Sequence, residues 1–212
     1  MPDISALGHL RQPADRDALQ AWLLAQARDA RGFVLSLDML VYGGLVPSRF
    51  IDDPLPDLLR RLQGVSALRQ AAPGRPIVAF AATMRISNNN EAQEEKPYWA
   101  EHGERLWAWS YHTDRARVLQ DDDSRARALA AEALIPRALR DDYLHTRHRN
   151  LQVTRAALEL VRQGVIDELV LPQDDTAEFG LNIAERRALQ AEVDAAGLAS
   201  RVSIRPGADE VM

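Results

Sequence analysis

Four short apolar runs, separated by longer segments with helical periodicity, constrain the fold of this chain more than any other feature. The runs have the length of strands and lie at Phe33–Leu37, Ile77–Ala82, Asp167–Leu171 and Val202–Ile204. Between them, apolar residues recur at three- and four-residue spacing, which is typical of amphipathic helices. Buried strands that alternate with helices predict a mostly parallel sheet joined by right-handed crossovers.

Helices are predicted at Pro13–Ala30, at Asp53–Gln70, in pieces between Pro97 and Gly164, and at Asn182–Ala196. Pro136 interrupts the long third region because proline removes a helical hydrogen bond. Asn150–Gln163 is the clearest helix of that region. The expected architecture is a three-layer α/β domain whose mostly parallel sheet is flanked by helices. Part of a (β/α) barrel and a doubly wound sheet both fit this alternation.

Residues 1–212 are expected to form a single α/β domain, because no repeat or low-complexity linker divides the chain. No strand precedes the first predicted helix, and no helix follows the last predicted strand. The chain is therefore expected to be an incomplete fragment of a larger protein. Open sheet edges and uncovered apolar surface predict marginal stability or self-association.

Composition excludes several classes of function. With a net charge of −5, the chain has no general electrostatic reason to bind nucleic acid or an anionic membrane. It has no cysteine, which excludes disulfides, thiolate catalysis and cysteine metal sites. No run is long and apolar enough to span a bilayer, and the first residues lack the pattern of a signal peptide. These features assign no compartment.

Polar and acidic residues follow each predicted strand. In parallel α/β folds, ligands bind where the carboxyl ends of the strands meet. The residues in question are Asp38 after the first strand, Arg85, Asn90 and Glu91 after the second, Asp174 and Asp175 after the third, and Asp209 and Glu210 after the fourth. An acid at every strand end predicts one shared small-molecule site. The alternative is a set of solvated loops and helix caps.

Other motifs carry less information. Gly43-Gly44 has neither the dinucleotide-binding nor the P-loop spacing, and no serine lies in a nucleophile elbow. His145 and His148 are three residues apart, but we interpret them as solvated helix residues. His102 is the favoured site histidine because it lies close to Tyr98 and Trp99.

Aromatic residues concentrate in one segment of a chain that contains only 6% of them, namely at Tyr98, Trp99, Trp107, Trp109 and Tyr111. Their helical spacing favours core packing. The alternative is a platform on which a sugar or another ring stacks.

Several segments together resemble a known family. They are Leu35–Arg49 (LSLDMLVYGGLVPSR), Glu94-Glu95 with Pro97–Trp99, Arg147–Asn150, Leu171–Asp175 (LPQDD) and Gly207–Glu210 (GADE). This pattern resembles a bacterial family of proteins of roughly 500 residues, catalogued only as a domain of unknown function. Its members begin with a strand motif that this chain lacks, and Lys96 interrupts their usual Glu-Glu-Pro run. The resemblance implies that these loops form one functional unit, but it implies no reaction.

The leading functional hypothesis is a hydrolase that acts on a sugar-like small molecule, with paired carboxylates as acid and as nucleophile or base. A divalent-metal hydrolase and a non-catalytic binding domain are the alternatives. No cofactor is required, although a divalent cation fits the second alternative. The candidate catalytic residues are Asp38, Glu91, Asp174 and Asp175. The candidate substrate-binding residues are Tyr42, Arg49, Arg85, Asn90, Tyr98, Trp99, His102, Asp209 and Glu210.

Overall fold

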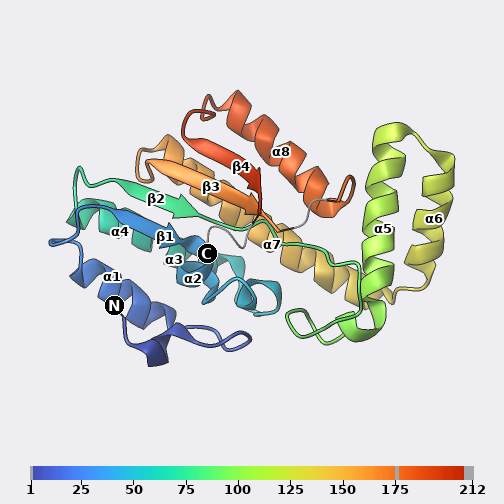
Figure 1. Cartoon of the computed structure of the whole chain (residues 1–212), viewed down its shortest axis with the longest axis horizontal. Helices are drawn as coiled ribbons and strands as arrows, with labels where there is room; N and C mark the ends of the chain where they lie inside the picture. Colours follow the sequence, from blue (N-terminus) through green and yellow to red (C-terminus); the bar gives the residue numbers. More distant parts are fainter. Residues whose placement is uncertain (1, 175–176, 208–212) are drawn as a thin grey trace.

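The described residues form, at their centre, an all-parallel sheet of four strands in the order β1-β2-β3-β4 (Figure 1). The structure, a computed structural model, describes residues 2–174 and 177–207. The strands are β1 (Phe33–Ser36), β2 (Ile77–Phe80), β3 (Glu168–Gln173) and β4 (Val202–Pro206). Parallel pairing of β1 with β2, and of each later pair, confirms the fold class predicted from the alternating pattern.

The helices between the strands are more finely divided than predicted. Before β1 come the 3-10 helix η1 (Ile4–Leu7) and α1 (Arg16–Ala25). Between β1 and β2 lie α2 (Leu37–Tyr42), the 3-10 helix η2 (Pro47–Arg49), α3 (Leu55–Leu62) and α4 (Gly64–Ala71). Between β2 and β3 lie α5 (Trp99–Leu119), α6 (Asp122–Ala133) and α7 (Arg137–Arg162), and α8 (Leu181–Ala195) joins β3 to β4.

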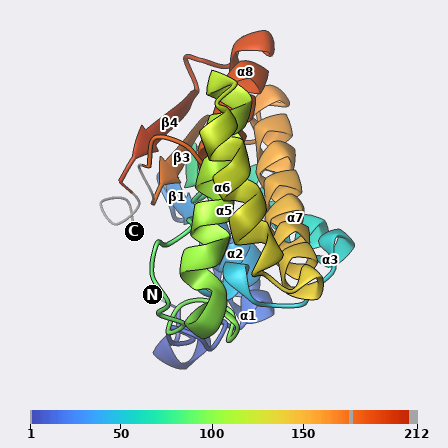
Figure 2. The same ribbon diagram turned by 90° about the vertical axis from the view of Figure 1, so that its right-hand side faces the viewer.

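One face of the sheet carries the main hydrophobic core. Alternate strand residues such as Leu35, Ala79 and Leu169 are buried in one cluster with apolar residues of the helices. Figure 2 shows the sheet on one side of the molecule, with α7 and α3 on the other side. The predicted third layer is therefore not formed by the described residues, because the helices that flank the sheet gather on one face of it.

The opposite face of the sheet is apolar but largely uncovered in the part of the chain that the structure describes. Val34 is 76% exposed, and Val78, Phe80 and Val170 are only half-buried. Register places Val34 beside Val78, and Phe80 beside Val170. A consecutive strand order with helices on one face is the winding of successive β/α units in a barrel, and it lacks the reversal of strand order found in a doubly wound sheet.

A second hydrophobic cluster lies away from the sheet. It is built around Trp99, Leu106 and Trp109 of α5, together with Ile135 and Tyr143. Figure 1 shows the α5–α6 hairpin standing beside one end of the sheet, next to α7. None of the described helices has the length and apolar character needed to cross a membrane.

Candidate functional site

Asp38 occupies the first turn of α2, which corrects the prediction that it lies in a loop. Ser36 ends β1, and its hydroxyl accepts a hydrogen bond from the Met39 amide (3.2 Å), so the chain turns directly from strand into helix. The Asp38 Oδ2 atom accepts a hydrogen bond from the Ala82 amide at 2.8 Å. This bond ties the end of β1 to the segment after β2.

Asp38 is a buried acid at this edge of the sheet. The residue is only 5% exposed, and this burial raises the pKa of its carboxyl from 3.8 to about 6, although the Ala82 amide and the positive charge of Arg49 lower it. A carboxyl with a pKa near 6 exchanges its proton close to neutral pH. Asp38 is therefore suited to proton transfer or to a charge-dependent structural role.

A cluster of five charged side chains joins the loops that follow β1, β2 and β3. Arg49 contacts Glu94 and Glu95 at 3.2 Å each, and Asp174 at 3.1 Å. Arg85 contacts the same three carboxylates at 3.0, 3.3 and 3.6 Å. We call these five residues the ion-pair network. Because each arginine contacts all three acids, loss of one arginine would leave the buried Glu95 with a single cationic partner.

Burial within the ion-pair network is uneven. The Arg49 side chain is 2% exposed and that of Glu95 is 3% exposed, whereas 28% of Arg85 is exposed. Burial raises the pKa of Glu95 above its usual value, and the two arginines only partly offset this effect. Arg85 is therefore the arginine of the network that a ligand can reach most easily.

Arg85 and Asp174 also line an open cleft with a volume of about 520 Å³. The loop after β2 contributes Arg85 to Asn89 to the lining, α5 contributes Trp107 and Tyr111, and the segment after β3 contributes Asp174, Ala177 and Glu178. This volume lies within the range of small-molecule sites.

An aromatic stack forms part of the lining of the cleft. The rings of Trp107 and Tyr111 lie one helical turn apart on α5, with centroids 5.0 Å apart and planes at 19°. Phe179 meets Tyr111 edge-on at 5.7 Å and fixes its orientation. The cleft thus combines a flat apolar surface with amide, guanidinium and carboxylate groups.

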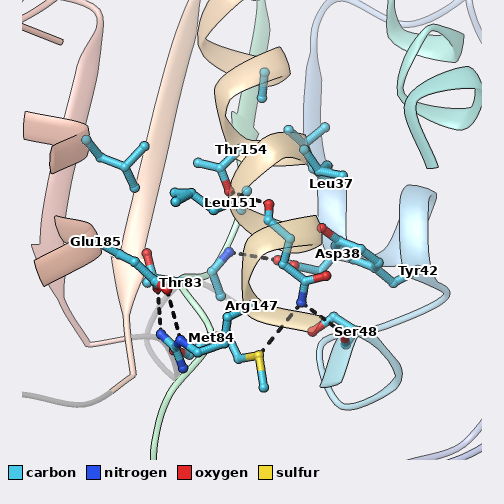
Figure 3. Close-up of a pocket in the computed structure, with 16 residues that line it drawn as sticks. Leu37, Asp38, Tyr42, Ser48, Thr83, Met84, Arg147, Leu151, Thr154 and Glu185 are labelled. Carbon is cyan, nitrogen blue, oxygen red and sulfur yellow. Dashed lines mark hydrogen bonds and ion pairs between the residues drawn. The ribbon is translucent and has the colours of Figure 1, made fainter. Parts of the chain in front are cut away.

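A much smaller cavity lies behind the strand ends, between the sheet and α7 (Figure 3). Asp38, Tyr42, Ser48 and Thr83 line it, together with the Arg147–Glu185 ion pair (2.6 Å) that joins α7 to α8. Its volume of about 20 Å³ has room for about one water molecule. It is too small for a substrate.

The strand ends also hold hydrogen-bonding capacity that the described chain does not use. The amide of Gln173 is buried, and neither its nitrogen nor its oxygen has a partner among the described residues. A parallel bridge pairs Gln173 with Thr83, so the two side chains lie on the same face of the sheet. Gln173 belongs to β3, which extends two residues beyond Leu171, where the strand was predicted to end. A buried amide without partners costs free energy.

Four other residues predicted at the site, Tyr42, Tyr98, Trp99 and His102, do not line the cleft. Trp99 packs in the second hydrophobic cluster, where the centroids of its ring and the Tyr143 ring are 5.5 Å apart. The Tyr98 hydroxyl donates a hydrogen bond to the Asp142 carboxylate (2.8 Å). The buried His102 ring lies 3.3 Å from an Arg105 nitrogen. None of these three side chains lines the cleft, and Tyr42 is buried beside the small cavity.

The loop after β2 holds Asn90 and Glu91 at the surface. The Asn90 side chain accepts a hydrogen bond from the Glu104 amide of α5 (3.0 Å), and Glu91 is exposed. Neither residue is part of the cleft lining. Asp175, Asp209 and Glu210 lie outside the described residues, so their predicted roles remain hypotheses.

Within residues 2–174 and 177–207, no group of three or more histidine or acidic side chains is arranged to hold a metal ion. Of the four aspartates predicted at the strand ends, Asp38, Asp174, Asp175 and Asp209, which would supply the oxygen ligands of a divalent metal, this part of the chain contains only Asp38 and Asp174. The divalent-metal hypothesis therefore gains no support from the described donors.

From the sequence, Trp107 and Tyr111 were expected at the site only in the alternative of a stacking platform, and Glu178 was not expected there. The four-residue spacing of Trp107 and Tyr111 was the available signal, because it places both rings on one face of a helix. Nothing in the sequence showed that this face meets the loop after β2. Glu178 gave no signal, since it lies in a polar loop.

The parallel sheet makes this chain an α/β protein, with a candidate ligand site where the ion-pair network meets the cleft at the strand ends. More specifically, the chain belongs to the family described as "Protein of unknown function (DUF4127)", whose model matches residues 1–212. This match confirms the resemblance seen in the sequence motifs. No curated protein and no solved structure matches the chain.

Proposed function

We propose that this protein is a hydrolase that binds a sugar-like small molecule in the cleft beside the ion-pair network. The observation that carries the proposal is the position of Asp174. Its carboxylate contacts both arginines of the network, and it lines the same cleft as the Trp107–Tyr111 stack.

A sugar matches the chemistry of this cleft. The apolar face of a pyranose ring packs on aromatic rings. Its hydroxyl groups both donate and accept hydrogen bonds, as do the amides of Asn88 and Asn89 and the hydroxyl of Ser87 in the lining. A purely apolar ligand would displace water from these groups without replacing its hydrogen bonds, at a cost in affinity.

Hydrolysis of a glycosidic bond needs two carboxyl groups with different protonation states. We assign Asp174 the role of nucleophile or base, because its carboxylate is held by contacts with Arg49 (3.1 Å) and Arg85 (3.6 Å) at the edge of the cleft. Glu178 is the other carboxyl in the described lining, and we assign it the role of proton donor. Glu91, predicted from the sequence to be catalytic, lies outside this lining.

The test combines turnover and binding. The purified protein is assayed against a panel of chromogenic aryl glycosides, and the free sugars are titrated by calorimetry. Asp174→Asn and Glu178→Gln are each expected to lower turnover by about 10²–10⁴-fold, the usual contribution of a general acid or base. Trp107→Ala is expected to weaken binding, and Glu91→Gln is the matched control.

The outcomes separate the competing hypotheses. Full turnover by Asp174→Asn would overturn the assigned mechanism. Binding of a sugar without turnover would identify a binding domain. If no sugar of the panel binds, the proposal that the ligand is sugar-like is wrong. Activity that is lost with a chelator and restored by a divalent cation would favour the metal-dependent alternative.

A further inference from the structure

The loop that forms one wall of the cleft has no regular secondary structure, so it depends on side chains from elsewhere for its shape. We call residues 85–95 the cleft loop. At its start, the Arg85 carbonyl accepts hydrogen bonds from Arg147 (3.2 Å) and Tyr143 (3.4 Å) of α7. At its end, the turn that carries Glu94 and Glu95 is held by Arg49 and by Arg11.

Arg11 reaches this turn from the N-terminal segment, far away in the sequence. One nitrogen of its guanidinium, Nη1, donates to the carbonyl oxygens of Ala92 (3.1 Å), Gln93 (3.1 Å) and Glu95 (2.7 Å). The guanidinium also lies over the Phe50 ring, 4.4 Å from its centroid. Three carbonyls that converge on one cationic nitrogen fix the backbone of the turn.

Fixing the turn also fixes its side chains. Glu94 and Glu95 leave the turn toward Arg85, which they contact at 3.0 and 3.3 Å. Arg85 in turn lines the cleft. A continuous chain of contacts therefore runs from Arg11, which does not line the cleft, through the turn to Arg85, which does.

We infer that Arg11 is a positioning residue of the cleft: it sets the backbone of the turn 92–95 and, through Glu94 and Glu95, the placement of Arg85. The inference does not depend on the proposed reaction, because it concerns the shape of the cleft wall before any ligand binds. It assigns a role at the site to a residue that is itself exposed at the surface.

The test uses the protein without ligand and measures two quantities, one for the backbone of the turn and one for the Arg85 side chain. Hydrogen exchange by mass spectrometry reports on the amides of residues 92–95. The rate of phenylglyoxal labelling at Arg85 reports on that side chain, with the exposed Arg137 as an internal reference. The variants are Arg11→Ala, Arg11→Gln and Arg11→Lys. The control is Arg28→Ala, an exposed arginine that makes no side-chain bond in the described part of the chain.

In Arg11→Ala and Arg11→Gln, exchange at residues 92–95 and labelling at Arg85 are both expected to rise on the order of tenfold, the effect of losing a charged hydrogen bond. Arg11→Lys is expected to restore much of the protection, because an ammonium group donates up to three hydrogen bonds. Arg28→Ala should match the wild type. Circular dichroism melts confirm that each variant is folded.

Two outcomes would overturn the inference. If Arg11→Ala behaves like Arg28→Ala at both places, Arg11 does not hold the turn. If exchange rises while labelling at Arg85 is unchanged, Arg11 has only a local structural role and does not position the cleft. Neither outcome bears on whether the cleft hydrolyses a sugar, so this inference and the proposed function fail separately.

Discussion

Asp38 is an ionisable side chain in a buried position, so its contribution to the free energy of unfolding depends on pH. Its folded-state pKa of about 6 lies above its ordinary value of 3.8. The folded protein therefore holds this proton more tightly than the unfolded chain does. The resulting stabilisation is fully present below about pH 4, and it is lost as pH rises through about 6.

Asp38→Asn should remove this dependence, since an amide does not ionise. Relative to the wild type, the variant is expected to gain up to roughly 3 kcal/mol of stability between pH 4 and pH 8. Urea unfolding at the two pH values measures the gain. The control is Asp17→Asn, an exposed acid on α1. An equal pH response in both variants would show that Asp38 is not the titrating group.

At the scale of elements, Gly103 shows how closely the cleft loop lies against α5. A Cβ atom at this position would overlap the Asn89 carbonyl oxygen and the indole of Trp99. Glycine inside a helix normally costs about 1 kcal/mol relative to alanine, so the close approach of the loop accounts for it here.

Gly103→Ala should therefore destabilise the protein by about 1–3 kcal/mol, as overpacking does, instead of stabilising it. Exchange at residues 87–91 should also increase, because the loop is pushed away from the helix. Ala100→Gly, at an exposed position earlier on α5, is the helix-propensity control and should cost about 1 kcal/mol without changing the loop. A stabilised Gly103→Ala variant would contradict the close approach seen at Asn89.

The elements that could be predicted from the sequence are those whose signal is local. The apolar runs at Phe33 and Ile77 marked strands, because burial of a parallel strand leaves little room for polar residues. The helix α2 was missed because Leu37 continues the apolar run, while the capping bond from Ser36 is visible only in three dimensions. The ion-pair network could not be predicted either, because it joins residues as far apart in the sequence as Arg49 and Asp174, which are 125 positions apart.

At the scale of the whole molecule, the apolar face that the described residues leave uncovered predicts self-association. Val34 is its most exposed member at 76%. Burial of such a face against a second copy is favourable at roughly 25 cal/mol per Å². The wild type should therefore show concentration-dependent association in sedimentation experiments, and Val34→Lys should shift it toward the monomer. The control is Val118→Lys on α5, which is also exposed but lies away from the sheet. A wild type that remains monomeric at all concentrations would contradict this expectation.

The long segment between β2 and β3 carries part of the cleft lining, although the pairing of the two strands does not require it. The two strands pair directly, although residues 81–167 lie between them and include the whole α5–α6 hairpin. The entropic cost of closing such a loop grows only slowly with its length. The hairpin packs in the second hydrophobic cluster, together with Met84 and Ile86 after β2 and Tyr143 of α7, and it contributes Trp107 and Tyr111 to the cleft. Evolution can therefore lengthen, shorten or replace this branch to change ligand preference while the sheet and its packed helices are inherited unchanged.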